Sequence, residues 1–163
     1  MMSVTFIDTS VLCELLRVPG KSDPAGFPGI TAEMDRRDRA GERFVIPVTS
    51  VIETGNHIAQ VKGPDPEIRF KVADRLARFL RTTLHGRAPW LVLDTRLGAD
   101  FVEAVCAGAS TGRSLAALAQ EKVGAGDVAL LVERDQLLAT SAFRTAQVWT
   151  LDAGLRAAAE VQR

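Results

Sequence analysis

Short apolar runs alternate with amphipathic segments along this chain, and that order restricts the fold more than any other feature. Between the runs, apolar residues recur at helical spacing, which predicts helices that each bury one face. A strand–helix–strand order predicts parallel strands with right-handed crossovers and helices on both faces of the sheet. We therefore expect an α/β fold, a three-layer α/β/α sandwich with a central parallel sheet of four to five strands. The runs that predict strands are 4–7, 43–47, 90–94 and 146–152.

The rest of the chain divides into predicted helices and loops. Segment 18–29 holds three prolines and three glycines, which predicts a loop. No internal repeat, low-complexity tract or second domain is indicated, so we expect residues 1–163 to form a single domain with its own core. Helices are predicted at 10–17, 30–41, 49–61, 67–84, 99–107, 115–120 and 127–139, with a short one behind the last strand.

Charge and cysteine content limit the possible partners and compartment. Lys plus Arg (20) equals Asp plus Glu (20), so no global field attracts nucleic acid, although a local basic stripe stays possible. Two cysteines are too few for a disulfide framework, and we expect Cys13 and Cys106 to be reduced core residues of a cytoplasmic protein. There is no signal-peptide pattern, and no apolar run approaches the roughly 18 residues of a membrane span, so no membrane contact is expected.

Four acids lie at predicted junctions between strands and helices. Asp8 ends the first strand, Asp152 ends the last, and Asp127 opens the helix after "VGAG". Glu53 lies in the first turn of the predicted helix after the second strand. Each has an ordinary structural explanation. The three aspartates can cap helices, and Ser50 with Glu53 has the spacing of a capping box.

In a parallel sheet these four acids would meet at one edge, where α/β proteins bind ligands. Two unit charges about 4 Å apart repel by roughly 4 kcal/mol at an effective dielectric near 20. Such a cluster protonates, takes a cationic partner from elsewhere, or binds a metal ion. Oxygen-only donors suit Mg²⁺ or Mn²⁺, which can activate water and stabilise a phosphodiester under attack.

Four ordered segments give the chain a resemblance to the PIN-domain ribonucleases, and among them to the VapC-type toxins of toxin–antitoxin pairs. The segments are "FIDTSVL", "TSVIE", "GDVALLVERD" and "WTLD". The resemblance implies an endonuclease that uses Mg²⁺ or Mn²⁺ to cut single-stranded or structured RNA. It also implies a homodimer and a small antitoxin protein that blocks the site. The family's metal ligands fall on Asp8, Glu53, Asp127 and Asp152, and its nearby hydroxyl residues on Thr9 or Ser10 and on Thr150.

Several alternatives stay open at this point. Asp135 also begins a segment like the family's helix, but Gly124 and Gly126 mark a helix start that favours Asp127. His57, four residues after Glu53, is interpreted as a surface or second-shell group, and Asp94 as a cap or loop acid. Segment 33–39 mixes acids with arginines, which favours a solvated helix face over an RNA contact. A PIN-like binding module that does not cut, or a metal-dependent DNA nuclease, remains an alternative function.

Overall fold

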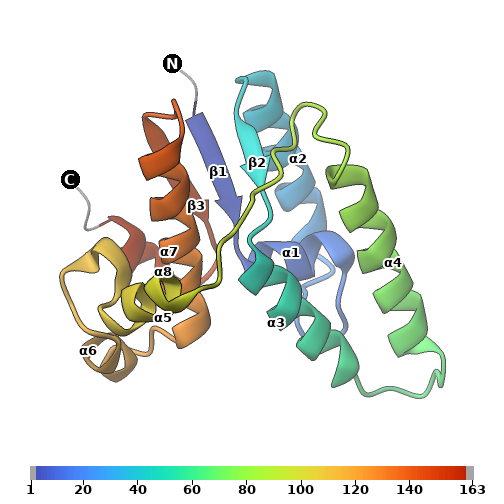
Figure 1. Ribbon diagram of the computed structural model, residues 1–163. Helices are drawn as coiled ribbons and strands as arrows, with labels where there is room; N and C mark the ends of the chain where they lie inside the picture. Colours follow the sequence, from blue (N-terminus) through green and yellow to red (C-terminus); the bar gives the residue numbers. More distant parts are fainter. Residues whose placement is uncertain (1–2, 161–163) are drawn as a thin grey trace.

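The computed structural model describes residues 3–160 and contains a parallel sheet of three strands (Figure 1). The strands are β1 (Ser3–Ile7), β2 (Arg43–Val45) and β3 (Thr145–Trp149), and their order across the sheet is β2-β1-β3. Both outer strands pair in parallel with β1. The parallel pairing agrees with the α/β prediction from the sequence. The ends of the predicted domain, 1–2 and 161–163, lie outside the described residues.

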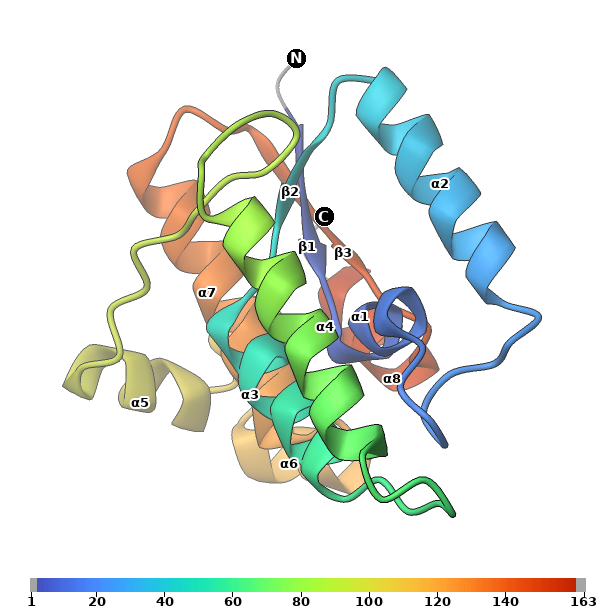
Figure 2. The ribbon, with the colours of Figure 1, turned by 90° about the vertical axis from the view of Figure 1, so that its right-hand side faces the viewer.

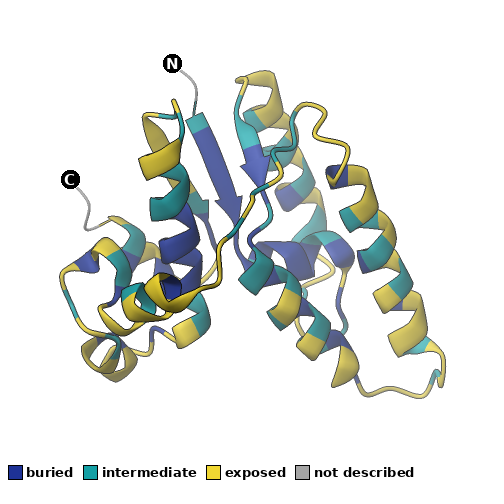
Figure 3. Ribbon diagram, in the orientation of Figure 1, coloured by how far each residue is buried: buried dark blue, intermediate teal, exposed yellow. Residues whose placement is uncertain are grey.

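Helices pack against two apolar clusters to which the strands contribute. One apolar cluster packs Ile7, Phe44 and Trp149 against α1 to α4, and the other packs Val4 and Phe6 against α6, α7 and α8. Figures 1 and 3 show the two groups of helices on either side of β1 and β2, most of whose residues are buried. The helices are α1 (Thr9–Leu16), α2 (Phe27–Arg39), α3 (Val48–Ala59), α4 (Ile68–Thr83), α5 (Ala99–Cys106), α6 (Leu115–Gln120), α7 (Ala125–Thr140) and α8 (Ala153–Glu160), with a 3₁₀ turn η1 (Ala109–Thr111).

Segment 90–94 does not form the predicted strand. It makes a single bridge between Trp90 and Phe44, held by hydrogen bonds from Phe44 N to Pro89 O and from Leu91 N to Phe44 O, both 2.8 Å. Strand β2 ends at Val45, one residue after Phe44, and Pro47 has no N–H with which to extend the ladder. The described sheet therefore has three strands rather than four to five.

Three local predictions also differ from the structure. Helix α2 begins at Phe27, inside the predicted loop, with Pro28 in its first turn, a position that tolerates proline. Helix α3 begins at Val48 behind Pro47, so Ser50 lies inside the helix and the predicted capping box with Glu53 is wrong. Cys13 is buried as expected. Cys106 ends the thinly covered helix α5 and is exposed.

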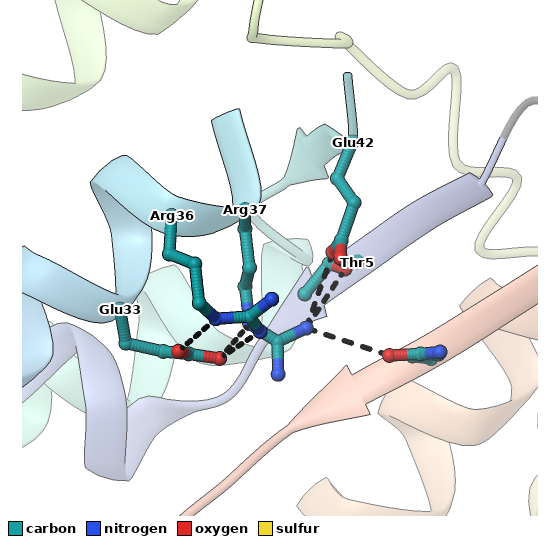
Figure 4. A network of polar contacts seen from close by, with 6 residues as sticks. Thr5, Glu33, Arg36, Arg37 and Glu42 are labelled. Carbon is teal, nitrogen blue, oxygen red and sulfur yellow. Dashed lines mark hydrogen bonds and ion pairs between the residues drawn. The ribbon is translucent and has the colours of Figure 1, made fainter. Parts of the chain in front are cut away.

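Segment 33–39 does more than form a solvated helix face. The side chain of Arg37 is 15% exposed and donates to Glu33 at 2.6 Å, to Glu42 at 3.1 Å and to Thr5 at 3.4 Å. Figure 4 shows how it reaches from α2 to the start of β1. Its guanidinium also lies 5.1 Å from the ring centroid of Trp149. Arg37 therefore ties α2 to the sheet.

The carboxyl ends of β1 and β3 lie side by side. Ile7 is paired with Trp149, and Asp8 N donates to Trp149 O at 3.1 Å. Figure 2 shows α1, α3 and α8 gathered below the strands at this edge. The residues that follow each strand are thus brought to one place. Within residues 3–160, no helix combines the length and apolar character needed to cross a membrane.

Candidate functional site

The four predicted acids line one cavity at the carboxyl edge of the sheet. Its volume is about 250 Å³. Asp8 and Asp152 come from the ends of β1 and β3, because these parallel strands finish together. Glu53 comes from α3 and Asp127 from the first turn of α7. The lining residues are Asp8, Thr9, Ser10, Cys13, Lys21, Glu53, His57, Asp127 and Asp152.

Asp8 is the most enclosed of the four acids, with 5% of its surface exposed. It caps α1, since its Oδ2 accepts from Ser10 N at 3.2 Å. The same oxygen accepts from the hydroxyls of Ser10 at 2.6 Å and Thr150 at 2.8 Å. Ser10 Oγ in turn accepts from Leu151 N at 2.9 Å. The hydroxyls of Ser10 and Thr150 therefore hold the Asp8 carboxylate against the end of β3.

Asp152 is joined to Asp8 through Thr150. The Thr150 hydroxyl donates to Asp8 and accepts from Asp152 N at 2.9 Å. Asp152 Oδ1 accepts from Leu155 N at 2.8 Å, which caps the start of α8. The cap that the sequence allows is therefore present at both strand ends, and it does not remove the acid from the cavity.

Glu53 reaches the cavity from the second turn of α3, because that helix begins at Val48. Its Oε2 accepts from the Thr9 hydroxyl at 2.7 Å. Its Oε1 lies against the backbone of Gly126, where an added Cβ would stand only 1.8 Å away. The glycine at this position thus leaves the space that the Glu53 carboxylate occupies.

Asp127 is the third residue of α7, which begins at Ala125 rather than at the predicted 127. Its Oδ2 accepts from Gly124 N at 2.8 Å. Burial raises the pKa of the Asp127 carboxyl to about 6. The Gly124 N–H lowers this pKa, and the negative charges of Asp8, Glu53 and Asp152 raise it further. The four acids therefore interact electrostatically across the cavity.

The four carboxylates share one hydrogen-bonding pattern. Each uses one oxygen to accept hydrogen bonds from the protein, and no hydrogen bond from the described residues reaches its other oxygen. Those second oxygens are not fully enclosed. Asp152 is exposed, and among the described residues that are not exposed, the fully buried side-chain atoms without a partner are those of Glu14, Ser50 and Thr54. The cavity thus presents four open carboxylate oxygens.

The donor set fits a hard divalent cation in type, since it consists of carboxylate oxygens. The four carboxylates are not arranged as a complete metal-binding site. Among residues 3–160, no group of three or more His, Cys, Asp or Glu side chains is placed to hold a metal ion. The hydrogen bonds to Ser10, Thr9 and Gly124 hold three of the carboxylates in their present positions. Side-chain rotation would be needed to converge on one ion.

Asp135, the alternative third acid, lies away from the cavity. Its Oδ2 accepts from Ser110 N at 3.1 Å and Ser110 Oγ at 2.6 Å, and its Oδ1 pairs with Arg134 at 3.0 Å. It stands two turns beyond Asp127 on α7, and the cavity lining does not include it. The geometry favours Asp127, as the flanking glycines do. Asp94, in turn, is exposed and lies outside this cavity.

Three lining residues add to the predicted set. Lys21 comes from the loop after α1, where no periodic pattern marks it. His57, interpreted from sequence as a surface or second-shell group, also lines the cavity. Burial and the charge of Lys21 lower its pKa, while Glu53 raises it. Burial raises the pKa of the Cys13 thiol to about 11, so it stays protonated and is a poor metal ligand.

Comparison with known proteins adds no relative: no family model, no curated protein and no solved structure matches this chain.

Proposed function

We propose that this protein is a Mg²⁺- or Mn²⁺-dependent endoribonuclease with a PIN-like fold, of the VapC toxin type. The observation that carries the proposal is the convergence of Asp8, Glu53, Asp127 and Asp152 on one cavity, each with an open oxygen. Four segments distant in sequence supply these acids in the order that the resemblance predicts. A parallel sheet with helices on both faces suits the predicted sandwich, with segment 90–94 beside β2 in place of an outer strand.

A divalent cation bound here would neutralise the carboxylates, polarise a phosphodiester and make a water molecule easier to deprotonate. The chain's own residues would supply the oxygen ligands and orient them. Asp8, Glu53, Asp127 and Asp152 supply the open oxygens. The hydroxyls of Ser10 and Thr150 orient Asp8, and that of Thr9 orients Glu53.

The raised pKa of Asp127 supports this assignment. Burial is the largest cause of the rise, and the charges of three neighbouring carboxylates add to it; a bound cation would offset both effects. An acid with only a structural role would gain no stability from lying beside three other carboxylates. Lys21 is the only lysine or arginine in the cavity lining, and it pairs with none of the described acids. Within the described part of the chain, no ion pair with Lys21 therefore offsets the negative charge of the cavity.

Cleavage of RNA by the wild type and Asp8→Asn, with Mg²⁺ or Mn²⁺ and with EDTA, tests the proposal. We expect EDTA to abolish cleavage. We expect Asp8→Asn to lower the rate by about 100-fold or more, because even residues that only orient a ligand are worth 10–100-fold. Asp94→Asn is the matched control, since that acid is exposed and outside the cavity. Metal-independent cleavage, or an unimpaired Asp8→Asn, would refute the mechanism.

A PIN-like module that binds RNA or protein without cutting is the second candidate. The observation in its favour is that the carboxylates, as placed in residues 3–160, do not form a group ready to hold a metal. Calorimetry separates the two functions. A nuclease should bind Mn²⁺ with an affinity that Asp8→Asn lowers, whereas the binding module should take up RNA tightly and Mn²⁺ not at all. Parallel digests of RNA and DNA distinguish a ribonuclease from a DNA nuclease.

The same resemblance predicts the partners: a second copy of the chain and a small antitoxin protein that covers the cavity, in the cytoplasm. A neighbouring short gene for a DNA-binding protein with a basic tail would support the toxin assignment. Co-expression of that protein should suppress both RNA cleavage and any toxicity of this chain.

A further inference from the structure

A second cavity of about 290 Å³ adjoins the carboxylate cavity. The two share Lys21 and His57 in their linings, so they lie next to each other at these side chains. The second cavity lies between the loop after α1 and the end of α3. Its lining consists of Pro19, Gly20, Lys21, His57, Gln60, Val61 and Lys62.

The charges of the two cavities are opposite. The first is lined by four acids and one lysine, whereas the second contains no acid and two lysines, Lys21 and Lys62. Both lysines are exposed, and within residues 3–160 neither forms an ion pair or a side-chain hydrogen bond. By contrast, Lys71 on α4 pairs with Asp65 at 2.8 Å and with Glu67 at 3.7 Å. The ammonium groups of Lys21 and Lys62 are therefore available to an anionic ligand.

The loop that carries Lys21 is held firmly. Lys21 N donates to Val18 O at 3.0 Å, and Ser22 Oγ donates to the same oxygen at 2.9 Å. Val18 itself is fully buried. Asp23 N donates to the buried Glu14 carboxylate at 2.9 Å. This anchoring keeps the backbone of Lys21 at the junction of the two cavities while its side chain remains free to meet a ligand.

An RNA strand carries a phosphate at every nucleotide, so a strand whose scissile phosphate sits at the carboxylates must place the next phosphate close by. We propose that the second cavity is a subsite for that neighbouring backbone phosphate, contacted by Lys21 and Lys62. Gln60 and His57 supply further hydrogen-bonding groups in the same lining. This inference rests on the proposed ribonuclease function and adds to it the residues that seat the strand.

The subsite explains how a chain with balanced charge can hold RNA. Lys and Arg together equal Asp and Glu, so phosphate contacts have to be local. Two lysines beside the acidic cavity place positive charge only where the strand continues past the cut. Each lysine that meets a phosphate releases counterions, which makes the affinity depend on salt concentration.

The test is the binding of a labelled single-stranded RNA to Lys62→Gln and Lys21→Gln, measured by fluorescence anisotropy over a range of salt concentrations, with Ca²⁺ in place of Mg²⁺. Lys71→Gln is the control, because Lys71 is paired and lines neither cavity. We expect each subsite variant to lose about three- to tenfold in affinity and its salt slope to fall by about 0.7. In cleavage assays Lys62→Gln should raise KM with kcat near the wild-type value.

The outcomes separate the subsite from the nuclease function. Wild-type RNA affinity and salt slope in both variants, or an equal loss in Lys71→Gln, would overturn the subsite. Calorimetry with Mn²⁺ should give the wild-type affinity for Lys62→Gln, because Lys62 lies outside the carboxylate cavity. If the wild type neither binds Mn²⁺ nor cuts RNA, the nuclease fails, yet a specific loss in the lysine variants would still establish the phosphate contacts. A wild type that binds no RNA would overturn both.

Discussion

Two acids on the same helix, Asp127 and Glu133, have opposite environments. Glu133 is 1% exposed, and both of its oxygens are used. It accepts from Val48 N at 3.0 Å, from Thr49 N at 3.2 Å and from Thr49 Oγ1 at 3.0 Å, and also from the hydroxyl of Thr95 at 3.1 Å. Asp127 accepts one hydrogen bond, from Gly124 N, and its second oxygen faces the cavity open.

The difference teaches that burial alone does not separate a structural acid from a candidate ligand. Glu133 is the more buried, but its four hydrogen bonds satisfy its charge and cap α3. Asp127 is less enclosed and accepts one hydrogen bond, and burial, with a further contribution from the charges of three neighbouring carboxylates, raises its pKa to about 6. The number of hydrogen-bond donors around each carboxylate oxygen distinguishes the structural acid from the candidate ligand.

The largest effect on stability is expected from replacing Glu133, both of whose carboxylate oxygens accept hydrogen bonds. Glu133→Ala leaves the N–H groups of Val48 and Thr49 without their acceptor, and we expect it to lower the free energy of unfolding by about 3–5 kcal/mol. Asp127→Asn should leave the free energy of unfolding unchanged or raise it, because it removes a charge that its neighbours oppose. Denaturant unfolding of the two variants provides the comparison, and an equal loss of stability in both would erase the distinction.

A smaller and more selective effect is expected from Gly126→Ala. The added Cβ would meet Glu53 Oε1 at 1.8 Å and displace that carboxylate, the far end of a flexible side chain. Alanine also suits a helix better than glycine by up to about 1 kcal/mol. We therefore expect stability to hold or rise while the affinity for Mn²⁺, measured by calorimetry, falls by about tenfold.

Gly55→Ala is the matched control for that substitution. Gly55 lies in α3, two residues from Glu53, and an added Cβ there meets nothing within 4 Å. It should bring the same helix gain without any loss of Mn²⁺ affinity. If Gly126→Ala and Gly55→Ala bind Mn²⁺ equally well, Glu53 is not part of the metal site.

The alternation of strands and helices was enough to predict the sheet edge and two of its acids. Asp8 directly follows β1 and Asp152 comes three residues after the last residue of β3, so the parallel pairing of the two strands brings both acids to one edge of the sheet. Asp127 was predicted from glycines that mark a helix start, which are local signals. The placement of Asp8, Asp127 and Asp152 therefore follows from the strand pattern and from this local helix signal.

Contacts distant in sequence could not be predicted in this way. The Ser50–Glu53 spacing suggested a local cap for α3, but the cap comes from Glu133, 84 residues beyond Thr49. Lys21 sits in a loop whose path follows from a buried carboxylate and a backbone turn rather than from periodicity. Segment 90–94 has the apolar content of a strand because Trp90, Leu91 and Leu93 pack on the two cores. The apolar content of the segment does not reveal its backbone pairing, which ends after one bridge.

The smallest expected effect is the pH dependence of stability that Asp127 confers. Its pKa is raised from 3.8 to about 6 in the folded state, so the folded protein holds this proton more tightly than the unfolded chain does. The resulting stabilisation is complete below about pH 4 and is lost as the pH rises through 6. His57, whose pKa is lowered, contributes in the opposite direction, as do acids stabilised by partners. The measurement is therefore the difference in Tm between wild type and Asp127→Asn, without metal.

We expect the Tm of Asp127→Asn to exceed that of the wild type by a few degrees at pH 7, and this advantage to shrink toward pH 5, where Asp127 is protonated. The two proteins share Asp8, Glu53, Asp152, His57 and Lys21, which also face the cavity, so the comparison isolates one group. Saturating Mn²⁺ should remove the penalty in the wild type, because the cation offsets the crowded charges. A Tm difference that stays constant from pH 5 to 7 would mean that Asp127 is as well satisfied as Glu133, and the contrast between the two acids of α7 would not hold.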